Sequence, residues 1–433
     1  MTLHSGDVAQ TENLLRSYFS RDPEQRFELE RAIGAGMSGV AWKIKYEEQI
    51  QGQTQTRRLV LKVERPRDEE LPSQSDYEGD TPMTNVDDFN DDGEDEGNGG
   101  NEGSENNNAN EDIDYNAEVD GRIPYTFDPS AHQLVNERNA LKMMQKARHI
   151  VNLIEPPHDP LATRFEGVEA HGLAGWVLME YLENGTLRDF VTNVSEILDE
   201  PLPNRLLWRL FLCLIRACIA MAYPPHEGPN GVVTERVRPG RRPRKTEHGD
   251  MHDENVMFGP LLPNGGIEHA LTPVMKLIDF GNMSDFPDDD DHAWRGERQN
   301  IFEIGVLMCL LISLDSDSVA LVVDGGNDMY TGFLSAGNNQ PPIKVAAGFM
   351  CPDDPDNEDF SHIDPILLRV VLTCTAWNPP DRPSLAALEQ LAYRAVNERT
   401  QQAYFQANFP SAEAESDENI RLIIQDMIFN ART

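Results

Sequence analysis

Residues 27–46, FELERAIGAGMSGVAWKIKY, alternate apolar and polar side chains, break at glycines and then resume the same alternation. A period of two is typical of a strand that is buried on one face. Gly34, Gly36 and Gly39 form a GxGxxG pattern, which in a dinucleotide-binding domain is followed by a helix. A second strand pattern follows here instead. We therefore predict a glycine-rich hairpin, whose backbone amides can approach a polyphosphate because no side chains intervene.

Along the rest of the chain the patterns change from strands to helices. Strand patterns recur at 59–64 (LVLKVE) and 176–182 (WVLMEYL). Between them, a helix pattern at 131–147 places Leu134, Leu141 and Met144 on one face. Further helix patterns occupy 205–222, 300–314, 367–377, 385–396 and 418–429. A strand-rich first third before a helix-rich remainder predicts an α+β fold of two lobes with a cleft between them.

Charge is distributed unevenly over the 433 residues. The chain has 37 lysines and arginines against 74 aspartates and glutamates, a net charge of −37. Twenty of the acidic residues lie between Asp68 and Asp120, where no lysine or arginine occurs. Such a segment buries too little apolar surface to offset the entropy of ordering, so we predict that it is disordered. The net charge also argues against a protein that binds nucleic acid by neutralising phosphates.

The sequence contains no stretch that approaches the roughly 18 uninterrupted apolar residues of a membrane span. Its first residues also lack the basic-then-apolar order of a secretory signal. We therefore expect no membrane partner and a cytoplasmic or nuclear location. The five cysteines are scattered and show no CxxC spacing. We interpret Cys213, Cys218, Cys309, Cys351 and Cys374 as reduced core residues rather than metal ligands or disulfide partners.

Residues 248–256, HGDMHDENV, concentrate two histidines, three carboxylates and an asparagine between two hydrophobic stretches. A polar surface loop needs no function, and neither a lysine at the end of a strand pattern nor a glutamate on a helix is informative alone. In combination these elements follow the order of the signature elements of protein kinases. That order is the glycine hairpin, Lys62, Glu137, Asp250, Asn255 and the turn Asp279-Phe280-Gly281.

On these elements, the chain resembles a eukaryotic-type protein kinase domain, most like the divergent kinase-like proteins of filamentous fungi. The resemblance covers about residues 27–395, less the acidic segment. It implies a small antiparallel sheet with one main helix, then a larger and mostly helical lobe. The implied organisation is an N-terminal extension (1–26), an N-lobe (27–182) interrupted by a disordered acidic insert (67–125), a C-lobe (183–395) with a basic loop (224–247), and a C-terminal helical extension (396–433).

The resemblance assigns a role to each signature residue. The glycine hairpin would cover ATP, Lys62 would hold its α- and β-phosphates, and Glu137 would pair with Lys62. Asp250 would accept or orient the hydroxyl of the substrate, while Asn255 and Asp279 would hold Mg²⁺. The chemistry agrees, because the charge that grows on the transferring phosphoryl group needs fixed cations, and magnesium needs hard oxygen ligands.

The adenine would lie beside a second group of residues. Met179, Glu180, Tyr181 and Leu182 resemble the gatekeeper and hinge of the family, where backbone groups would bind the adenine edge. Ala41 stands where the family usually has a valine above the adenine. The loss of one or two buried methyl groups there is worth about 1 kcal/mol.

The catalytic loop departs from the family's usual HRDLKPEN in a way that bears on regulation. Gly249 replaces the arginine that would bind a phosphorylated activation segment. The segment from Asp279 to Asn300 is short, has Ser284 as its one hydroxyl residue, and lacks the Ala-Pro-Glu motif. We therefore predict an enzyme that does not depend on phosphorylation of its activation loop.

Three further positions carry expectations. His252 occupies the position of a lysine thought to stabilise the transferring phosphoryl group. It is either a catalytic residue, with activity that rises toward about pH 6.5, or a residue that only hydrogen-bonds the loop. Asn300 replaces an aspartate and is expected to hold the backbone of the catalytic loop. Arg382-Pro383-Ser384 resembles the family's late Arg-Pro motif, and Ser384 can also cap a helix.

The acceptor of the phosphate is left open. The resemblance favours a serine/threonine protein kinase whose protein substrate would be basic if the run DDDD at 288–291 faces the cleft. HGDxHxxN also occurs in small-molecule kinases of the aminoglycoside and choline type, which share the two-lobed fold, and the missing Ala-Pro-Glu favours them. A pseudokinase that binds without turnover is the third reading. The sequence carries no signal of the oligomeric state.

Two insertions have alternative interpretations. The acidic insert is either a solvated spacer or a segment that docks a basic partner or shields the cleft. Extending a loop from about seven to about 65 residues costs only about 2 kcal/mol in closure entropy, so the lobe can accommodate the insert. The run RVRPGRRPRK at 236–245 is a solvated loop, a nuclear import signal or an anchor for the acidic insert.

Overall fold

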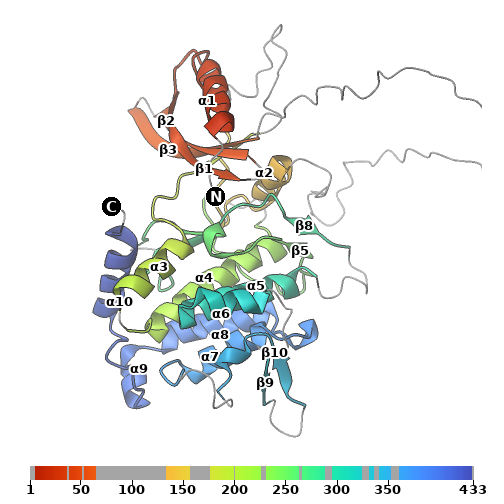
Figure 1. Cartoon of the computed structure of the whole chain (residues 1–433), viewed down its shortest axis with the longest axis vertical. Helices are drawn as coiled ribbons and strands as arrows, with labels where there is room; N and C mark the ends of the chain where they lie inside the picture. The colour runs from red at the N-terminus through yellow and green to blue at the C-terminus, as the bar shows by residue number, and fades with distance from the viewer. Residues whose placement is uncertain are drawn as a thin grey trace, which may run out of the picture. The chain divides into compact units, whose positions relative to one another are not determined.

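A four-stranded antiparallel sheet, followed along the chain by a larger set of helices, forms the described part of the protein (Figure 1). The computed structural model describes residues 5–36, 39–50, 53–64, 133–156, 176–198, 200–225, 231–262, 266–287, 295–323, 331–335, 341–352 and 360–431. These residues belong to one compact unit. The arrangement is α+β and consistent with two lobes, as the sequence predicts. The acidic insert and the run at 288–291 lie outside the described residues.

The sheet contains the predicted hairpin. Its strands are β1 (Phe27–Gly36), β2 (Gly39–Ile50), β3 (Gln53–Val63) and β4 (Trp176–Glu180), in the order β1-β2-β3-β4 with each neighbouring pair antiparallel. In the β2–β3 pairing Ala41 lies opposite Lys62, and in the β3–β4 pairing Lys62 lies opposite Val177. The register therefore places Lys62 on an inner strand, opposite the second residue after Gly39.

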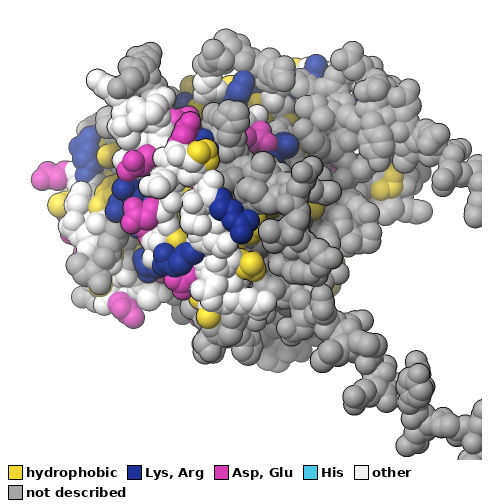
Figure 2. Space-filling model, turned by 90° about the horizontal axis from the view of Figure 1, so that it is seen from above, with side chains coloured by type: hydrophobic (Ala, Val, Ile, Leu, Met, Phe, Trp, Pro, Cys, Tyr) yellow, Lys and Arg dark blue, Asp and Glu magenta, His cyan; other side chains and the backbone are white. Residues whose placement is uncertain are grey.

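Helix α1 (Ser5–Phe19) covers part of this sheet and shares its core. Leu15 and Phe19 are buried with the apolar residues of β1, β2 and β3. The rings of Phe19 and Phe27 stack at 5.3 Å, and the ring of Phe27 meets Tyr46 at 5.0 Å. In the view from above, Lys and Arg side chains lie beside Asp and Glu side chains over the described part of that face (Figure 2). Helix α1 is thus part of the fold of the sheet.

Helix α2 (Gln133–Met143) occupies most of the helix predicted at 131–147. Leu134, Leu141 and Met144 are buried, as the periodicity of the sequence predicts. Their contacts belong to the larger hydrophobic core, which also contains most of the helical part of the chain. Glu137 is fully buried on the same helix, so it is not a solvated surface residue.

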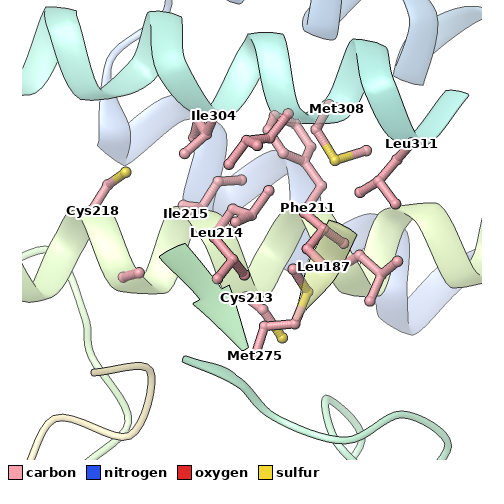
Figure 3. Close-up of a cluster of buried hydrophobic side chains, with 14 of the residues drawn as sticks. Leu187, Phe211, Cys213, Leu214, Ile215, Cys218, Met275, Ile304, Met308 and Leu311 are labelled. Atoms are coloured by element: carbon pink, nitrogen blue, oxygen red, sulfur yellow. The ribbon is translucent and has the colours of Figure 1, made fainter. Parts of the chain in front are cut away.

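The helical part is built around α4. Its helices are α3 (Leu187–Ile197), α4 (Asn204–Ala222), α5 (Glu297–Ser313), α6 (Ser316–Val323), α7 (Pro365–Cys374), α8 (Leu385–Glu398), α9 (Gln401–Gln406) and α10 (Asp417–Ile424), which continues as a π-helical turn, η5 (Gln425–Phe429). Helix α4 packs against α5 and α8. Phe211, Leu214 and Ile215 of α4 face Ile304 and Met308 of α5 (Figure 3).

Short strands and turns connect these helices to the sheet. The strands are β5 (Thr246–Glu247), β6 (Val256–Phe258), β7 (Met275–Leu277), β8 (Ser284–Asp285), β9 (Gly332–Leu334) and β10 (Ile343–Val345), and the 3-10 turns are η1 (Asp253–Asn255), η3 (Gly348–Met350) and η4 (Pro379–Asp381). β6 pairs with β7, and β5 pairs with β8. These two ribbons bring the loop at 248–255 and the turn at 279–281 to the same place.

Several predictions about single segments can be compared with the structure. All five cysteines are buried, and none of them forms a disulfide. Within the described ranges, no helix is both long enough and apolar enough to cross a membrane. In the basic run, Arg236 contacts Glu268 at 3.2 Å and Glu389 at 3.3 Å, and Arg244 pairs with Asp285. Part of that run is therefore neutralised by carboxylates of a turn, of α8 and of β8.

Candidate functional site

Lys62 lies between two carboxylates that are remote from it in sequence. Its Nζ donates to Glu137 Oε2 at 2.9 Å and to Asp279 Oδ1 at 2.7 Å. The three residues come from β3, α2 and the turn after β7. The predicted signature residues Lys62, Glu137 and Asp279 are therefore in direct contact.

The pKa values of Lys62 and Asp279 are both shifted in the direction that favours the charged form. Burial alone would lower the pKa of Lys62, but Glu137 and Asp279 outweigh burial and raise it, so the ammonium is charged at neutral pH. Burial raises the pKa of the Asp279 carboxyl, whereas Lys62 lowers it further than burial raises it. Asp279 has a φ of 61°, a left-handed conformation that residues other than glycine seldom adopt. Such strain at an ion-pair cluster is typical of functional sites.

The glycine hairpin places its three glycines in different environments. Gly34 pairs with Ala41 across β1 and β2, and Gly36 pairs with Gly39 at the turn. A Cβ on Gly39 would lie 2.0 Å from the carbonyl oxygen of Val63. Glycine is therefore required at position 39 by the packing of the sheet itself, and this requirement needs no ligand.

Asp250 and Asn255 stand at the two ends of one loop, as the five-residue spacing predicts. The side-chain nitrogen of Asn255 donates to the carbonyl oxygen of Asp250 at 2.8 Å and lies 3.0 Å from His252 Nε2. The carbonyl oxygen of Asn255 accepts from the Ile278 amide at 2.9 Å, one residue before Asp279. The loop and the Asp279 turn are thus joined through the backbone.

The side-chain oxygen of Asn255 is available to a ligand. Because its nitrogen is used within the loop, Oδ1 is the atom left for a ligand, and no donor in the described part of the chain reaches it. Asp279 offers a carboxylate on the adjoining turn. Carboxylate and amide oxygens are the hard ligands that Mg²⁺ prefers, so this donor set suits magnesium.

His248 and Asn300 hold the backbone of the loop at 248–255. Asn300 Oδ1 accepts from the His248 amide at 3.1 Å, and Asn300 Nδ2 donates to the carbonyl oxygen of Thr246 at 2.8 Å. Asn300 therefore supports the loop in the way expected of it. His248 Nε2 lies 2.9 Å from the carbonyl oxygen of Ile278, and its Nδ1 accepts from the Asp250 amide at 3.3 Å. Burial lowers the pKa of His248 to about 4, so it is neutral and positions Asp250.

His252 makes contacts within the loop that agree with the more modest of its two interpretations. Its Nδ1 accepts from the Glu254 amide at 3.3 Å and so caps the turn η1. Its Nε2 lies 3.6 Å from Asp250 Oδ1. A hydrogen bond with Asp253 is the largest cause that raises the pKa of His252, while burial opposes it. A chemical role for His252 stays a prediction.

Gly249 is where the loop meets the segment after Asp279. Its φ is 79°, and a Cβ there would lie 2.5 Å from the carbonyl oxygen of Asn282. Asn282 Nδ2 in turn lies 3.4 Å from Asp250 Oδ2, and Asn282 Oδ1 accepts from Gln133 of α2 at 2.9 Å. Asn282 therefore links Asp250 to α2. Asn282 is not among the residues predicted from the sequence, although its position directly after Asp-Phe-Gly is a usable signal.

Substituting Gly249 by alanine is expected to destabilise the protein by about 2–4 kcal/mol, from a left-handed backbone that costs about 1–2 kcal/mol plus a clash with Asn282. Gly240→Ala is the matched control, because Gly240 has a φ of 80° and no atom within 4 Å of its added Cβ. Urea unfolding of both variants measures the difference. Equal losses in the two variants would contradict the close packing of Gly249 against Asn282.

Hydrogen bonds to the Glu180 side chain hold the predicted hinge residues in place. Glu180 Oε1 accepts from Lys276 at 2.6 Å and from the side chain of Asn152 at 2.7 Å, and the Glu180 amide donates to the carbonyl oxygen of Asn152 at 3.0 Å. Met179 and Leu182 are buried on either side. Within the described ranges the Leu182 amide donates to no protein acceptor. Neither Lys276 nor Asn152 was identified from the sequence.

Ionic contacts fix the loop from the helical side. Arg188 of α3 donates to both Asp253 oxygens at 3.0 Å and to Glu254 Oε1 at 2.6 Å. Burial raises the pKa of the Asp253 carboxyl, but hydrogen bonds with His252 and Arg188 outweigh burial and hold the pKa well below its usual range. At the later motif, Arg382 Nε donates to the carbonyl oxygen of Ala376 at 2.9 Å, and Ser384 caps α8, as predicted.

The arrangement can bind an anion and a metal ion side by side. A charged lysine, two carboxylates and an amide oxygen from separate elements meet beside a loop that carries a further, half-exposed carboxylate, Asp250. Such a set can neutralise a polyanion and accept a proton from a hydroxyl. No model of a known protein family matches this chain.

Proposed function

We propose that the protein is an ATP-dependent phosphotransferase with a protein-kinase-like fold, which transfers the γ-phosphate to a serine or threonine hydroxyl of a protein. One observation carries the proposal. Lys62 is held between Glu137 and Asp279 on a strand beside a glycine hairpin, and the Asp279 turn is joined to the loop of Asp250 and Asn255. A buried ion pair across three elements is a poor way to gain stability, which favours a functional reason for it.

The chain's own residues would divide the work as follows. Lys62, kept charged by its two carboxylates, would bind phosphate oxygens, and Glu137 would fix the position of its ammonium. Asp250, held by His248 and Asn282, would take the proton of the acceptor hydroxyl. Asn255 and Asp279 would hold Mg²⁺, which when bound neutralises charge on the phosphates.

The anchored hinge supports adenine binding. The side chain of Glu180 is occupied by Lys276 and Asn152, so its backbone is fixed. The Leu182 amide, without an acceptor in the described part of the chain, would donate to the adenine edge. Ala41, opposite Lys62 in the sheet, would lie above the ring.

The contact between Gly249 and Asn282 supports independence from activation-loop phosphorylation. An arginine at position 249 would have to displace the Asn282 backbone. Asn282 already links the loop to α2 through Gln133. The residues that follow Asp279 are therefore held by direct packing, a role that a phosphate–arginine pair would otherwise serve.

A second candidate is a small-molecule hydroxyl kinase of the aminoglycoside or choline type. The absence of the Ala-Pro-Glu motif between Asp279 and Asn300 favours it. A module that binds Mg-ATP without turnover is the remaining alternative. All three readings use the same nucleotide site and differ in what receives the phosphate.

Phosphate transfer from γ-labelled ATP with Mg²⁺ separates these functions. The full chain is incubated in parallel with a basic protein, a neutral protein and a set of amino alcohols and aminoglycosides. Label on protein serine or threonine is the expected result. Label on the small molecules alone would replace the proposal by the second candidate, and saturable Mg-ATP binding without any transfer would overturn the enzyme reading.

The pH dependence of transfer tests the role of His252. If its imidazolium stabilises the phosphoryl group, kcat is expected to fall as pH rises through the pKa of His252. Because that pKa is raised, the fall is expected above pH 6.5, the ordinary value. His252→Lys is expected to move the fall to much higher pH, since lysine titrates near 10.4.

His252→Gln is the matched control, because glutamine can hydrogen-bond the loop but does not titrate in this range. Its rate is expected to be low and independent of pH over the same interval. A wild-type profile that neither variant changes would show that His252 only hydrogen-bonds the loop.

A further inference from the structure

Three metal-binding side chains meet in the core, away from the cluster at Lys62. His149 follows α2, Cys213 lies in α4, and His269 lies in the turn before β7. One ligand atom from each residue lies within 4.8 Å of the other two. Their exposed fractions are 0%, 2% and 1%. The sequence shows no metal-binding spacing here, because the three residues are separated by more than fifty positions.

Three of the four ring nitrogens of this cluster have no hydrogen-bond partner in the described structure. His149 Nε2 and both ring nitrogens of His269 are buried in the described structure with no hydrogen-bond partner. A buried polar atom without a partner is destabilising, and a group bound to these nitrogens would remove that cost. Two imidazoles and a thiol have the ligand types of a zinc site.

A carboxylate behind His149 fixes the direction of its imidazole. Glu235 Oε2 lies 2.6 Å from His149 Nδ1, and Glu235 Oε1 accepts from the His149 amide at 2.8 Å. Because Nδ1 is held by Glu235, Nε2 is the ring nitrogen that points away from the carboxylate. A carboxylate that orients a histidine in this way is the usual outer partner of a metal-bound imidazole.

Cys213 differs from the other cysteines of the helical core. Its sulfur lies within 4.8 Å of a ring nitrogen of His149 and of one of His269. In the described part of the chain, Cys218, five residues later in α4, belongs to no such group. Cys213 also lies on the side of α4 that faces away from α5 (Figure 3). The thiolate is the form of cysteine that binds metals.

We propose that His149, Cys213 and His269 bind a transition-metal ion, with zinc as the ion that the ligand set fits best. Imidazole and thiolate ligands favour such ions over magnesium or calcium, so this site would not compete for the metal of the Lys62 cluster. Three protein ligands leave one position of a zinc tetrahedron for water. This revises the interpretation of Cys213 as a plain core residue.

The ion would hold together the segments that support the candidate active site. The carbonyl oxygen of His149 accepts from the Leu277 amide at 2.9 Å, two residues before Asp279. His269 leads into the same strand, β7, and Cys213 fixes both to α4. The role assigned to the ion is therefore structural, and it does not depend on the proposed kinase activity.

Metal analysis of the full chain tests the proposal. The protein is expressed without a histidine tag, purified without chelators, and compared with Cys213→Ala and Cys218→Ala. We expect about one zinc ion per chain in the wild type and in Cys218→Ala, and almost none in Cys213→Ala. Cys218→Ala is the matched control, because it removes a buried sulfur from the same helix. Equal zinc content in the two variants would overturn the proposal.

Cobalt loading covers the case in which Cys213→Ala does not fold. Co²⁺ bound to a thiolate is expected to give a charge-transfer band in the wild type and in Cys218→Ala. Glu235→Gln is expected to keep that band but weaken metal binding about 10–100-fold, as is usual for an outer partner of a metal ligand. A wild-type protein that contains no metal and gives no cobalt band would contradict the proposal and would assign the cluster to a buried thiolate–imidazole pair.

Discussion

Asp250→Asn is expected to lower kcat for phosphate transfer by about 10²–10⁴-fold, the usual contribution of a general base. Asparagine keeps the shape of the side chain and its contact with Asn282 but cannot accept the hydroxyl proton. The Asp250 side chain is 46% exposed, so the change is expected to leave the folded state intact. Single-turnover transfer at saturating Mg-ATP measures the chemical step directly.

Glu254→Gln is the control for Asp250→Asn. Glu254 belongs to the same loop and is also exposed, but it pairs with Arg188 and does not contact Asp250. Its substitution is expected to change kcat less than about threefold, because an exposed ion pair contributes less than about 1 kcal/mol. Transfer that survives in Asp250→Asn at the wild-type rate would remove Asp250 from the mechanism.

Asp279→Asn is expected to weaken Mg²⁺-dependent ATP binding by about 100-fold or more, because a metal that neutralises phosphate charge contributes several kcal/mol. Asparagine is the suitable replacement, since it tolerates the left-handed backbone at this position. Asp279→Ala removes the same charge and is expected to be less stable as well, by about 1–2 kcal/mol of backbone strain. Titration calorimetry with and without Mg²⁺ measures the binding.

Asp285→Asn is the control for Asp279→Asn. Asp285 lies six residues further along, in β8, and pairs with Arg244 outside the cluster. Its substitution is expected to leave the affinity for Mg-ATP unchanged. If both variants bound Mg-ATP as the wild type does, Asp279 would not be a metal ligand and its bond to Lys62 would be only a structural ion pair.

The elements of the fold that the sequence predicts best are those with a strong period. The two strands around the glycines, the buried face of α2 and the apolar helices α4 and α5 all follow their patterns. The first and last residues of a strand or helix do not follow from periodicity, because tertiary contacts decide them. β3 begins at Gln53, well before the apolar run at 59–64, since pairing with β2 extends the strand through exposed polar residues.

Part of the candidate site can also be predicted, because its order along the chain is a motif. Lys62, Glu137 and Asp279 meet as the motif requires, although a solvated Glu137 was the more ordinary expectation for a helix. The supporting residues could not be predicted in this way. Asn282 and Lys276 act through contacts set by the folding of distant segments, and their types are common on any surface.

The cluster of His149, Cys213 and His269 illustrates the same limit more strongly. Each residue lies in an apolar or mixed stretch where a buried polar side chain has many ordinary explanations. Only the packing of α4 against the segments around β7 brings the three together. A spacing motif can reveal only ligands that lie in one local element. His149, Cys213 and His269 lie in three different segments.

The most direct test of the central claim is a calorimetric titration of the wild-type chain with ATP, with and without Mg²⁺. The claim is that Lys62, Glu137, Asp279 and the loop of Asp250 and Asn255 form one nucleotide site. It predicts saturable binding at one site that requires Mg²⁺ and is lost in Lys62→Met. No binding of ATP under either condition, or binding that Lys62→Met leaves unchanged, would contradict it.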